Sequence, residues 1–166
     1  MLLALASIEI TDAQSIKNSF MLFLYFKDLC FLRMRNNLIK NFKEKGFVTV
    51  PDVFSTSEIE FYREVVKDAI KERKQNDLRS LKEKSEYEQS FVQCQNLWED
   101  YPVLRELTFD QRLGEIASNL LEVSKLRVWH DQALVKEAGG RETDPHHDQP
   151  YWPIRETNTI TAWIPF

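Results

Sequence analysis

The spacing of apolar residues predicts helices in the first two thirds of the chain. Ser55-Thr56-Ser57-Glu58 fits a capping box, in which a serine hydroxyl and a glutamate satisfy free amides at a helix start. Behind it, apolar residues at helical spacing predict a helix that continues to about Lys74. We expect a shorter helix to end at Gly46 and another to begin at Thr108. Residues 75–90 are polar and predict a mobile loop or a loose helix extension.

Short apolar runs predict strands, chiefly after Lys125. Phe47–Pro51 is a candidate for a short early strand, and residues 126–135, 145–152 and 159–165 are candidates for later ones. Helices followed by strands predict an α+β fold, with helices packed on the outside of a β core. Strict alternation along the first late strand would place one set of side chains on a common face: Val128, His130, Gln132, Leu134 and Lys136.

The predicted strand at 145–152 contains His146 and Asp148, a His-x-Asp pair. Side chains two apart on a strand point the same way, so these two would converge on one ion while His147 faces the opposite side. Non-haem iron(II) sites use two imidazoles and one carboxylate on one face of the metal. Taken alone, the pair is more often an ordinary polar pair where a turn enters a strand, so the metal hypothesis depends on its context.

Three segments supply that context. Trp129–Lys136, His146–Pro153 and Thr161–Pro165 resemble the phytanoyl-CoA dioxygenase family, and the resemblance extends over roughly residues 38–166. It implies a double-stranded β-helix (jelly-roll) core, iron(II) bound by His146 and Asp148, and 2-oxoglutarate as cosubstrate. The partners it implies are molecular oxygen and a small-molecule or acyl substrate that becomes hydroxylated.

The resemblance also implies roles for other residues. Gln132, Trp163 and Asn96 match or lie near positions that contact 2-oxoglutarate, and Tyr151 and Trp152 lie on a stretch that lines the substrate mouth. Each has an alternative reading, because Gln132 can be satisfied by neighbouring backbone and the two aromatic residues can belong to the core or its rim. A further histidine, His130, is expected to be a hydrogen-bonded core residue and not a metal ligand.

The resemblance divides the chain into an atypical leader, residues 1–36, and a partial phytanoyl-CoA dioxygenase-like domain, residues 37–166. Family members continue with a second histidine ligand and an arginine that binds 2-oxoglutarate. We therefore expect the C-terminal part of the core to be missing and the chain to be truncated and inactive. The alternative is a non-catalytic jelly-roll binding module or a vestigial fragment.

The composition of the chain bears on nucleic-acid binding, on membrane insertion and on the cellular compartment. The 166 residues carry a formal charge of −4, which argues against a nucleic-acid binder because neutralising phosphates needs a concentrated basic surface. The apolar run Phe20–Phe26 is shorter than the roughly 18 to 20 residues that cross a bilayer. We therefore expect a buried or interfacial helix and no membrane span, with membrane insertion and a non-native leader as the alternatives. Two cysteines fit a reducing compartment, so we expect a cytoplasmic protein, and a peroxisomal location stays open.

Overall fold

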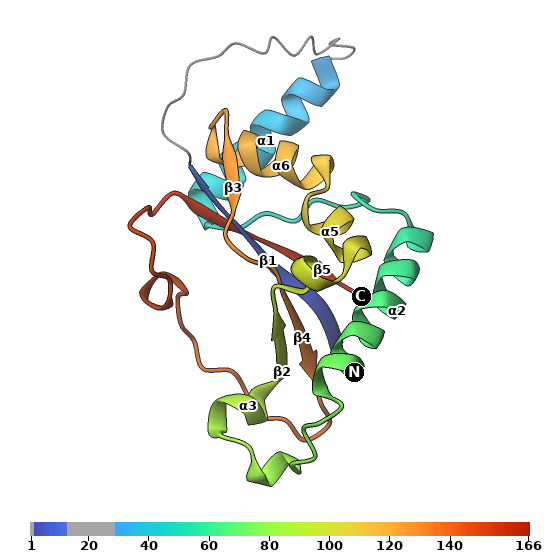
Figure 1. The fold of residues 1–166 in the computed structure, drawn as a ribbon. Coiled ribbons are helices and arrows are strands. Elements are labelled where there is room, and N and C mark those ends of the chain that lie inside the picture. Colours follow the sequence, from blue (N-terminus) through green and yellow to red (C-terminus); the bar gives the residue numbers. More distant parts are fainter. Residues whose placement is uncertain (1, 13–28) are drawn as a thin grey trace.

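The computed structural model describes residues 2–12 and 29–166. The helices in this part of the chain are α1 (Leu29–Lys45), α2 (Thr56–Lys74), α3 (Glu86–Ser90), α4 (Leu97–Asp100), α5 (Pro102–Thr108) and α6 (Gln111–Leu121). Two short 3-10 helices, η1 (Leu81–Glu83) and η2 (Gln149–Tyr151), accompany them. The strands are β1 (Leu2–Asp12), β2 (Val92–Gln95), β3 (Leu126–Val128), β4 (Gln132–Lys136) and β5 (Thr159–Pro165). Figure 1 shows how they are arranged.

The five strands form one antiparallel sheet in which β1 is central. One edge of β1 pairs with β4 and then with β3, and its other edge pairs with β5 along most of its length. Strand β2 extends the sheet beyond β4. The N-terminal segment therefore separates β4 from β5 (Figure 1).

Helices cover one face of this sheet. The buried core joins apolar residues of α2, α4, α5 and α6 to Cys94 of β2, Ala133 and Val135 of β4, and Ile164 of β5. Alternate residues of the same strands lie on the other face, where Gln132 is half-buried and Trp163 is 54% exposed. In Figure 1, α2 and α5 lie on one side of the sheet and the long connection from β4 to β5 runs on the other.

The predicted capping box is confirmed at the start of α2. The Ser55 hydroxyl accepts a hydrogen bond from the Glu58 amide, and a Glu58 carboxylate oxygen accepts one from the Ser55 amide at 2.7 Å. Arg112 of α6 donates to Glu58 at 2.8 Å and to the carbonyl of Val53 at 3.0 Å. The capped end of α2 is thereby tied to α6.

Other helix predictions need correction. Helix α1 does end before Gly46, which adopts φ +77°. The strand predicted at 47–51 is absent from the described structure, where Phe47 is 66% exposed and has no strand partner. Thr108 does not cap α6, since Asp110 accepts the hydrogen bond from the Arg112 amide at 2.8 Å and Thr108 ends α5 instead. Residues 75–90 contain η1 and α3 and are not simply a loop.

Two strand predictions are also wrong in detail. The segment 126–135 is divided at Trp129–Asp131, and both Val128 and Val135 pack on the core. Strict alternation is therefore broken, and Val128 does not share a face with Gln132. No strand forms at 145–152, where Asp148 has helical dihedral angles and precedes η2. Pro145, Pro150 and Pro153 lack the amide donor that a strand ladder requires.

The fold is a mixture of helices and strands with a small antiparallel sheet, as expected for the α+β class. A double-stranded β-helix consists of two facing sheets, and the described residues form one, so that part of the expectation stays a prediction. The apolar run Phe20–Phe26 lies outside the described residues. Among the described helices, none combines the length and the apolar character needed to cross a bilayer.

Candidate metal centre

The structure brings His146 and Asp148 together. Nε2 of the His146 imidazole lies 3.2 Å from Oδ1 of the Asp148 carboxylate. The other ring nitrogen, Nδ1, lies 2.7 Å from the backbone carbonyl of Asp144. A carbonyl can only accept, so in this contact the Nδ1–H group donates, and Nε2 is the ring nitrogen that faces the carboxylate. Metal-binding histidines commonly have this arrangement, in which an outer partner orients the ring.

The convergence has a different cause from the one the sequence suggested. The backbone turns at Asp148 into η2, where the Tyr151 amide donates to the Asp148 carbonyl at 2.8 Å. The Tyr151 ring meets the His146 ring edge-on, with centroids 6.3 Å apart. A helical turn and an aromatic contact, and not strand alternation, hold the two side chains on one side.

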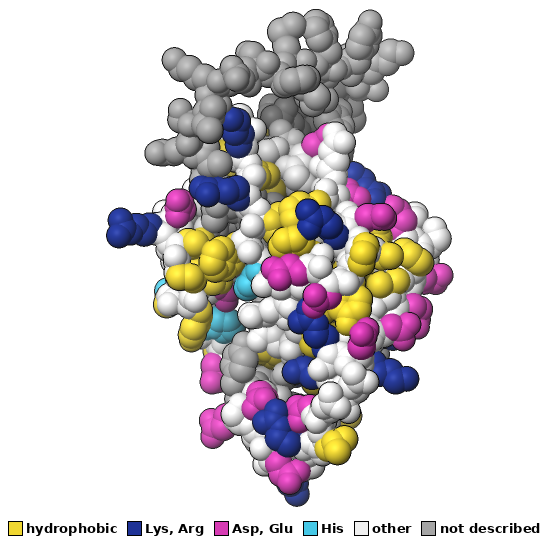
Figure 2. Space-filling model, in the orientation of Figure 1, with side chains coloured by type: hydrophobic (Ala, Val, Ile, Leu, Met, Phe, Trp, Pro, Cys, Tyr) yellow, Lys and Arg dark blue, Asp and Glu magenta, His cyan; other side chains and the backbone are white. Residues whose placement is uncertain are grey.

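A cavity of about 470 Å³ surrounds the pair, within the range typical of small-ligand sites. Its lining comes from one continuous stretch of chain that ends at the start of β5: His146, His147, Asp148, Gln149, Trp152, Thr157 and Thr159. Both side chains of the pair are more than 40% exposed, so the site is open to solvent. Figure 2 shows histidine side chains near hydrophobic ones on the face of the molecule that it draws.

The described residues hold no group of three or more His, Cys, Asp or Glu side chains arranged to bind a metal. His146 and Asp148 by themselves offer two donors of the types that iron(II) accepts, an imidazole nitrogen and a carboxylate oxygen. His147 also lines the cavity, in contrast to the opposite-facing position that strand geometry predicted for it.

Gln132 and Trp163 occupy one row across the sheet. Both lie in register with Ala6 of β1, Gln132 on one side and Trp163 on the other. Their chain neighbours Ala133 and Ile164 face the core, so Gln132 and Trp163 share the uncovered face, about 10 Å apart across two strand spacings. Gln132 accepts a hydrogen bond from the Gln93 side chain through its amide oxygen. Neither residue lines the cavity around His146.

The remaining predicted site residues are dispersed. Trp152 lines the cavity, whereas Tyr151 is 76% exposed, is not part of the lining and packs against the His146 ring. Asn96 adopts a left-handed conformation (φ 53°) between β2 and α4, and its carbonyl accepts a hydrogen bond from Arg73. Asn96 thus turns the chain, and it is not part of the cavity lining.

Asp131 is a structurally important residue to which the sequence assigned no role. It is fully buried, and its Oδ2 accepts hydrogen bonds from the Thr108 hydroxyl at 3.0 Å and the Trp98 amide at 3.2 Å. Burial raises the pKa of this carboxyl, while these two donors lower it. Asp131 links the interruption between β3 and β4 to α4 and α5. An acidic residue inside an apolar strand-like run is the sequence feature that points to such a role.

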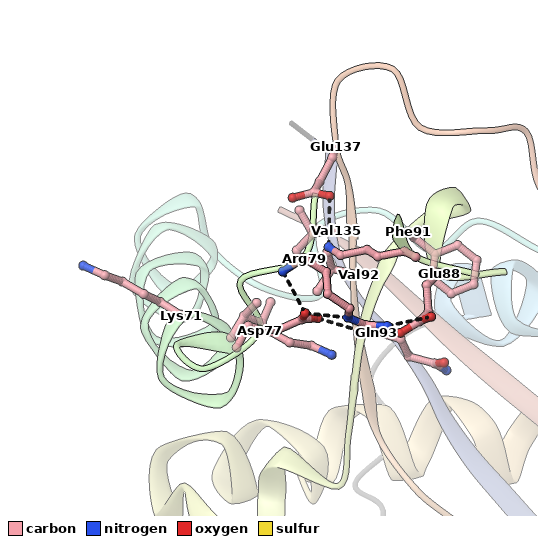
Figure 3. A pocket seen from close by; sticks show the side chains of 12 residues that line it. Lys71, Asp77, Arg79, Glu88, Phe91, Val92, Gln93, Val135 and Glu137 are labelled. Carbon is pink, nitrogen blue, oxygen red and sulfur yellow. Dashed lines mark hydrogen bonds and ion pairs between the residues drawn. The ribbon is translucent and has the colours of Figure 1, made fainter. Parts of the chain in front are cut away.

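A second cavity of similar size lies between the end of α2, the segment 77–88 and β2 (Figure 3). Arg79 bridges Asp77 and Glu88 there at 2.8 and 2.7 Å, and Lys84 lies 3.8 Å from Glu137. The Arg79 hydrogen bonds hold the pKa of both Asp77 and Glu88 at about 2. In Figure 3 the Lys71 side chain points away from these charges. Most of the charged side chains that line this cavity are paired with one another. They are therefore less available to bind a ligand than the side chains of the His146 site.

We compared the chain with curated proteins, with solved structures and with protein families. A search of curated proteins and a search of solved structures returned no match. A scan against protein families matches residues 42–166 to "Phytanoyl-CoA dioxygenase (PhyH)". The matched range contains the His-Asp pair, Gln132, Trp163 and four of the five strands. Because it covers well over half of the chain, this protein belongs to the phytanoyl-CoA dioxygenase family.

Proposed function

We propose that this protein is an iron(II)- and 2-oxoglutarate-dependent dioxygenase that hydroxylates a small-molecule or acyl substrate. The observation that carries the proposal is the 3.2 Å contact between His146 Nε2 and Asp148 Oδ1 in a chain of an oxygenase family. We assign the domain to residues 37–166 and place the protein in the cytoplasm.

In this proposal His146 and Asp148 hold the iron. The Nδ1 contact with the Asp144 carbonyl fixes the ring and keeps Nε2 available as a donor. Bound iron with 2-oxoglutarate would supply oxygen activation, coupled to oxidative decarboxylation of the cosubstrate to succinate and carbon dioxide. Gln132 would offer its amide to a cosubstrate oxygen, and Trp163 and Asn96 would complete that part of the site. Tyr151 and Trp152 would contact the substrate beside the pair.

One observation favours a second function, a non-catalytic binding module. The described residues provide two protein donors where such iron sites use three, so iron would bind weakly and turnover would be slow or absent. The open cavity could then bind a small molecule without transforming it. Both functions predict ligand binding near Trp152, but only the first requires the metal.

An anaerobic titration with iron(II), followed by 2-oxoglutarate, tests the proposal. The enzyme is expected to develop a visible metal-to-ligand absorbance band once both are present, and to form succinate when oxygen is admitted. Absence of the band at saturating iron, with no succinate formed, would contradict the dioxygenase function and favour the binding module. Zinc(II) in place of iron(II) is the matched control, because it binds similar donors and undergoes no redox change.

A further inference from the structure

Residues 2–12 form the strand that joins three otherwise separate parts of the sheet, namely the pair β2–β4, strand β3 and strand β5. Among the described strands, β4 and β5 do not pair with each other, and each pairs with β1 instead. Without β1, the pair β2–β4 and the strand β5 would each present an open edge to the same gap. Open strand edges carry unpaired amides and carbonyls and are ready to bind another strand.

The register shows that this gap fits the sequence of residues 2–12 closely. Leu3 lies opposite Val135, and Leu5 lies opposite Ala133 and Ile164, which all belong to the buried core. The apolar residues of β1 that lie opposite core residues stand at odd-numbered positions before Ser7 and at even-numbered positions after it. A register shift between Ala6 and Ile8 in the pairing with β5 accommodates this change. Ile8 then lies opposite Ala162, which packs against the core, and the same holds for Ile10 and Ile160.

On its other edge β1 keeps one continuous register, from Leu2–Lys136 in β4 to Asp12–Leu126 in β3. Strands β3 and β4 are interrupted at Trp129–Asp131, which changes the face that their core residues occupy. Ile10 is consequently opposite Val128, another residue packed against the core. A strand that slipped by one residue would lose all of these matches at once. The gap therefore selects an extended segment with apolar residues at two positions before and two positions after a one-residue bulge.

We propose that the gap between β4 and β5 is a strand-acceptor site that takes residues 2–12 of a second copy of this chain, so that two copies exchange β1. Every pairing in the sheet is retained in such an exchange, and only the path of the connecting chain differs. Residues 13–28 connect β1 to α1, and sixteen residues span up to about 50 Å when extended. That reach is longer than β1 itself, so the connection does not restrict β1 to its own copy.

Disulfide trapping tests the exchange in the full chain. Glu9 and Thr161 lie opposite each other in β1 and β5, and Thr161 is exposed. Chains carrying Glu9→Cys are mixed with chains carrying Thr161→Cys, both with Cys30→Ala and Cys94→Ala. They are refolded together at a concentration on the order of 1 mM, comparable with the effective concentration of a tethered segment. Oxidation is expected to give a disulfide-linked heterodimer.

Two controls accompany the mixture. A single chain with both Glu9→Cys and Thr161→Cys reports the register itself, whatever the source of β1. Glu9→Cys mixed with Leu78→Cys, at a residue that is 91% exposed, measures random collision between thiols. The proposal is overturned if the double variant forms its disulfide only within one chain while the mixed variants link no more than the Leu78 control. It is also overturned if the double variant forms no disulfide, because β1 is then not in this gap.

Discussion

The hydroxyl of Thr108, at the end of α5, donates a hydrogen bond to the buried carboxylate of Asp131, 3.0 Å away in the break between β3 and β4. The Trp98 amide at the start of α4 donates to the same oxygen. The Asp131 side chain thus connects α4 and α5 to the sheet. Asp131→Ala would leave both donors buried without an acceptor, so we expect a loss of about 2–3 kcal/mol in the free energy of unfolding. Urea unfolding at neutral pH measures this loss.

Asp131→Asn is the matched control, because its amide oxygen still accepts both hydrogen bonds. We expect it to cost less than about 1 kcal/mol. Burial raises the pKa of Asp131, so the folded state binds the proton more tightly than the unfolded chain. The wild type should lose stability relative to Asp131→Asn as the pH rises from below 3.8 through the raised pKa. A difference between the two that does not change with pH would contradict this interpretation.

Glu58 predicts the opposite pH dependence. The Arg112 side chain and the Ser55 amide and hydroxyl lower the pKa of Glu58 from 4.5 to about 2. Its stabilising effect is therefore complete above pH 4.5 and is lost as the pH falls towards 2. Thermal unfolding between pH 2 and pH 6 should show a shallower acid dependence for Glu58→Gln than for the wild type. Glu99→Gln, at an exposed position in α4, serves as the control and should keep the steeper wild-type dependence.

The two donors of the candidate metal centre predict a specific pattern of metal affinity. His146→Ala and Asp148→Ala should each weaken binding of cobalt(II), used as a spectroscopic substitute for iron(II). The loss should be at least as large as the roughly tenfold to hundredfold effect of removing an outer partner. His147→Ala changes a neighbour that lines the same cavity but is not one of the two proposed donors, so it should weaken binding by less than about tenfold. Equal losses in all three variants would assign the binding to the exposed segment in general.

Two glycines with open space around them should respond in opposite directions to alanine. Gly46 has φ +77°, where an alanine is strained by about 1–2 kcal/mol, so Gly46→Ala should destabilise the protein. Gly114 lies inside α6, and apart from its chain neighbours and the nearby backbone of its own helix no atom lies within 4 Å of the position that a Cβ would occupy, so Gly114→Ala should stabilise the protein by about 0.5–1 kcal/mol. Thermal unfolding of both variants under one condition measures the pair. Destabilisation by Gly114→Ala would contradict the open space around α6.

Local sequence patterns predicted the elements whose causes are local. The capping box at Ser55, the helix end before Gly46 and the strand at 159–165 each depend on neighbouring residues and are confirmed. The cap of α6 was misplaced because Thr108 and Asp110 are both good capping residues, and only the tertiary contact with Asp131 separates their roles. The central position of β1 depends on pairings across more than a hundred residues, which no local pattern contains.

The sequence predicted which two residues of the candidate site lie together, but it did not predict the backbone geometry that brings them together. His146 and Asp148 are adjacent as expected, but a turn at η2 positions them, because prolines prevent the strand. Gln132 and Trp163 share a row only because β1 lies between them, and that relationship was not visible before the sheet was known. The role of the pair as metal ligands stays a prediction.

Cys94 lies on the core side of β2, opposite Ala133, and is 5% exposed. Burial also raises the pKa of its thiol, so little reactive thiolate forms at neutral pH. A thiol reagent should therefore modify Cys94 only during excursions that separate β2 from the helices. In a Cys30→Ala background, the labelling rate of this one sulfur atom would measure how often such opening events occur, without the need to introduce a cysteine.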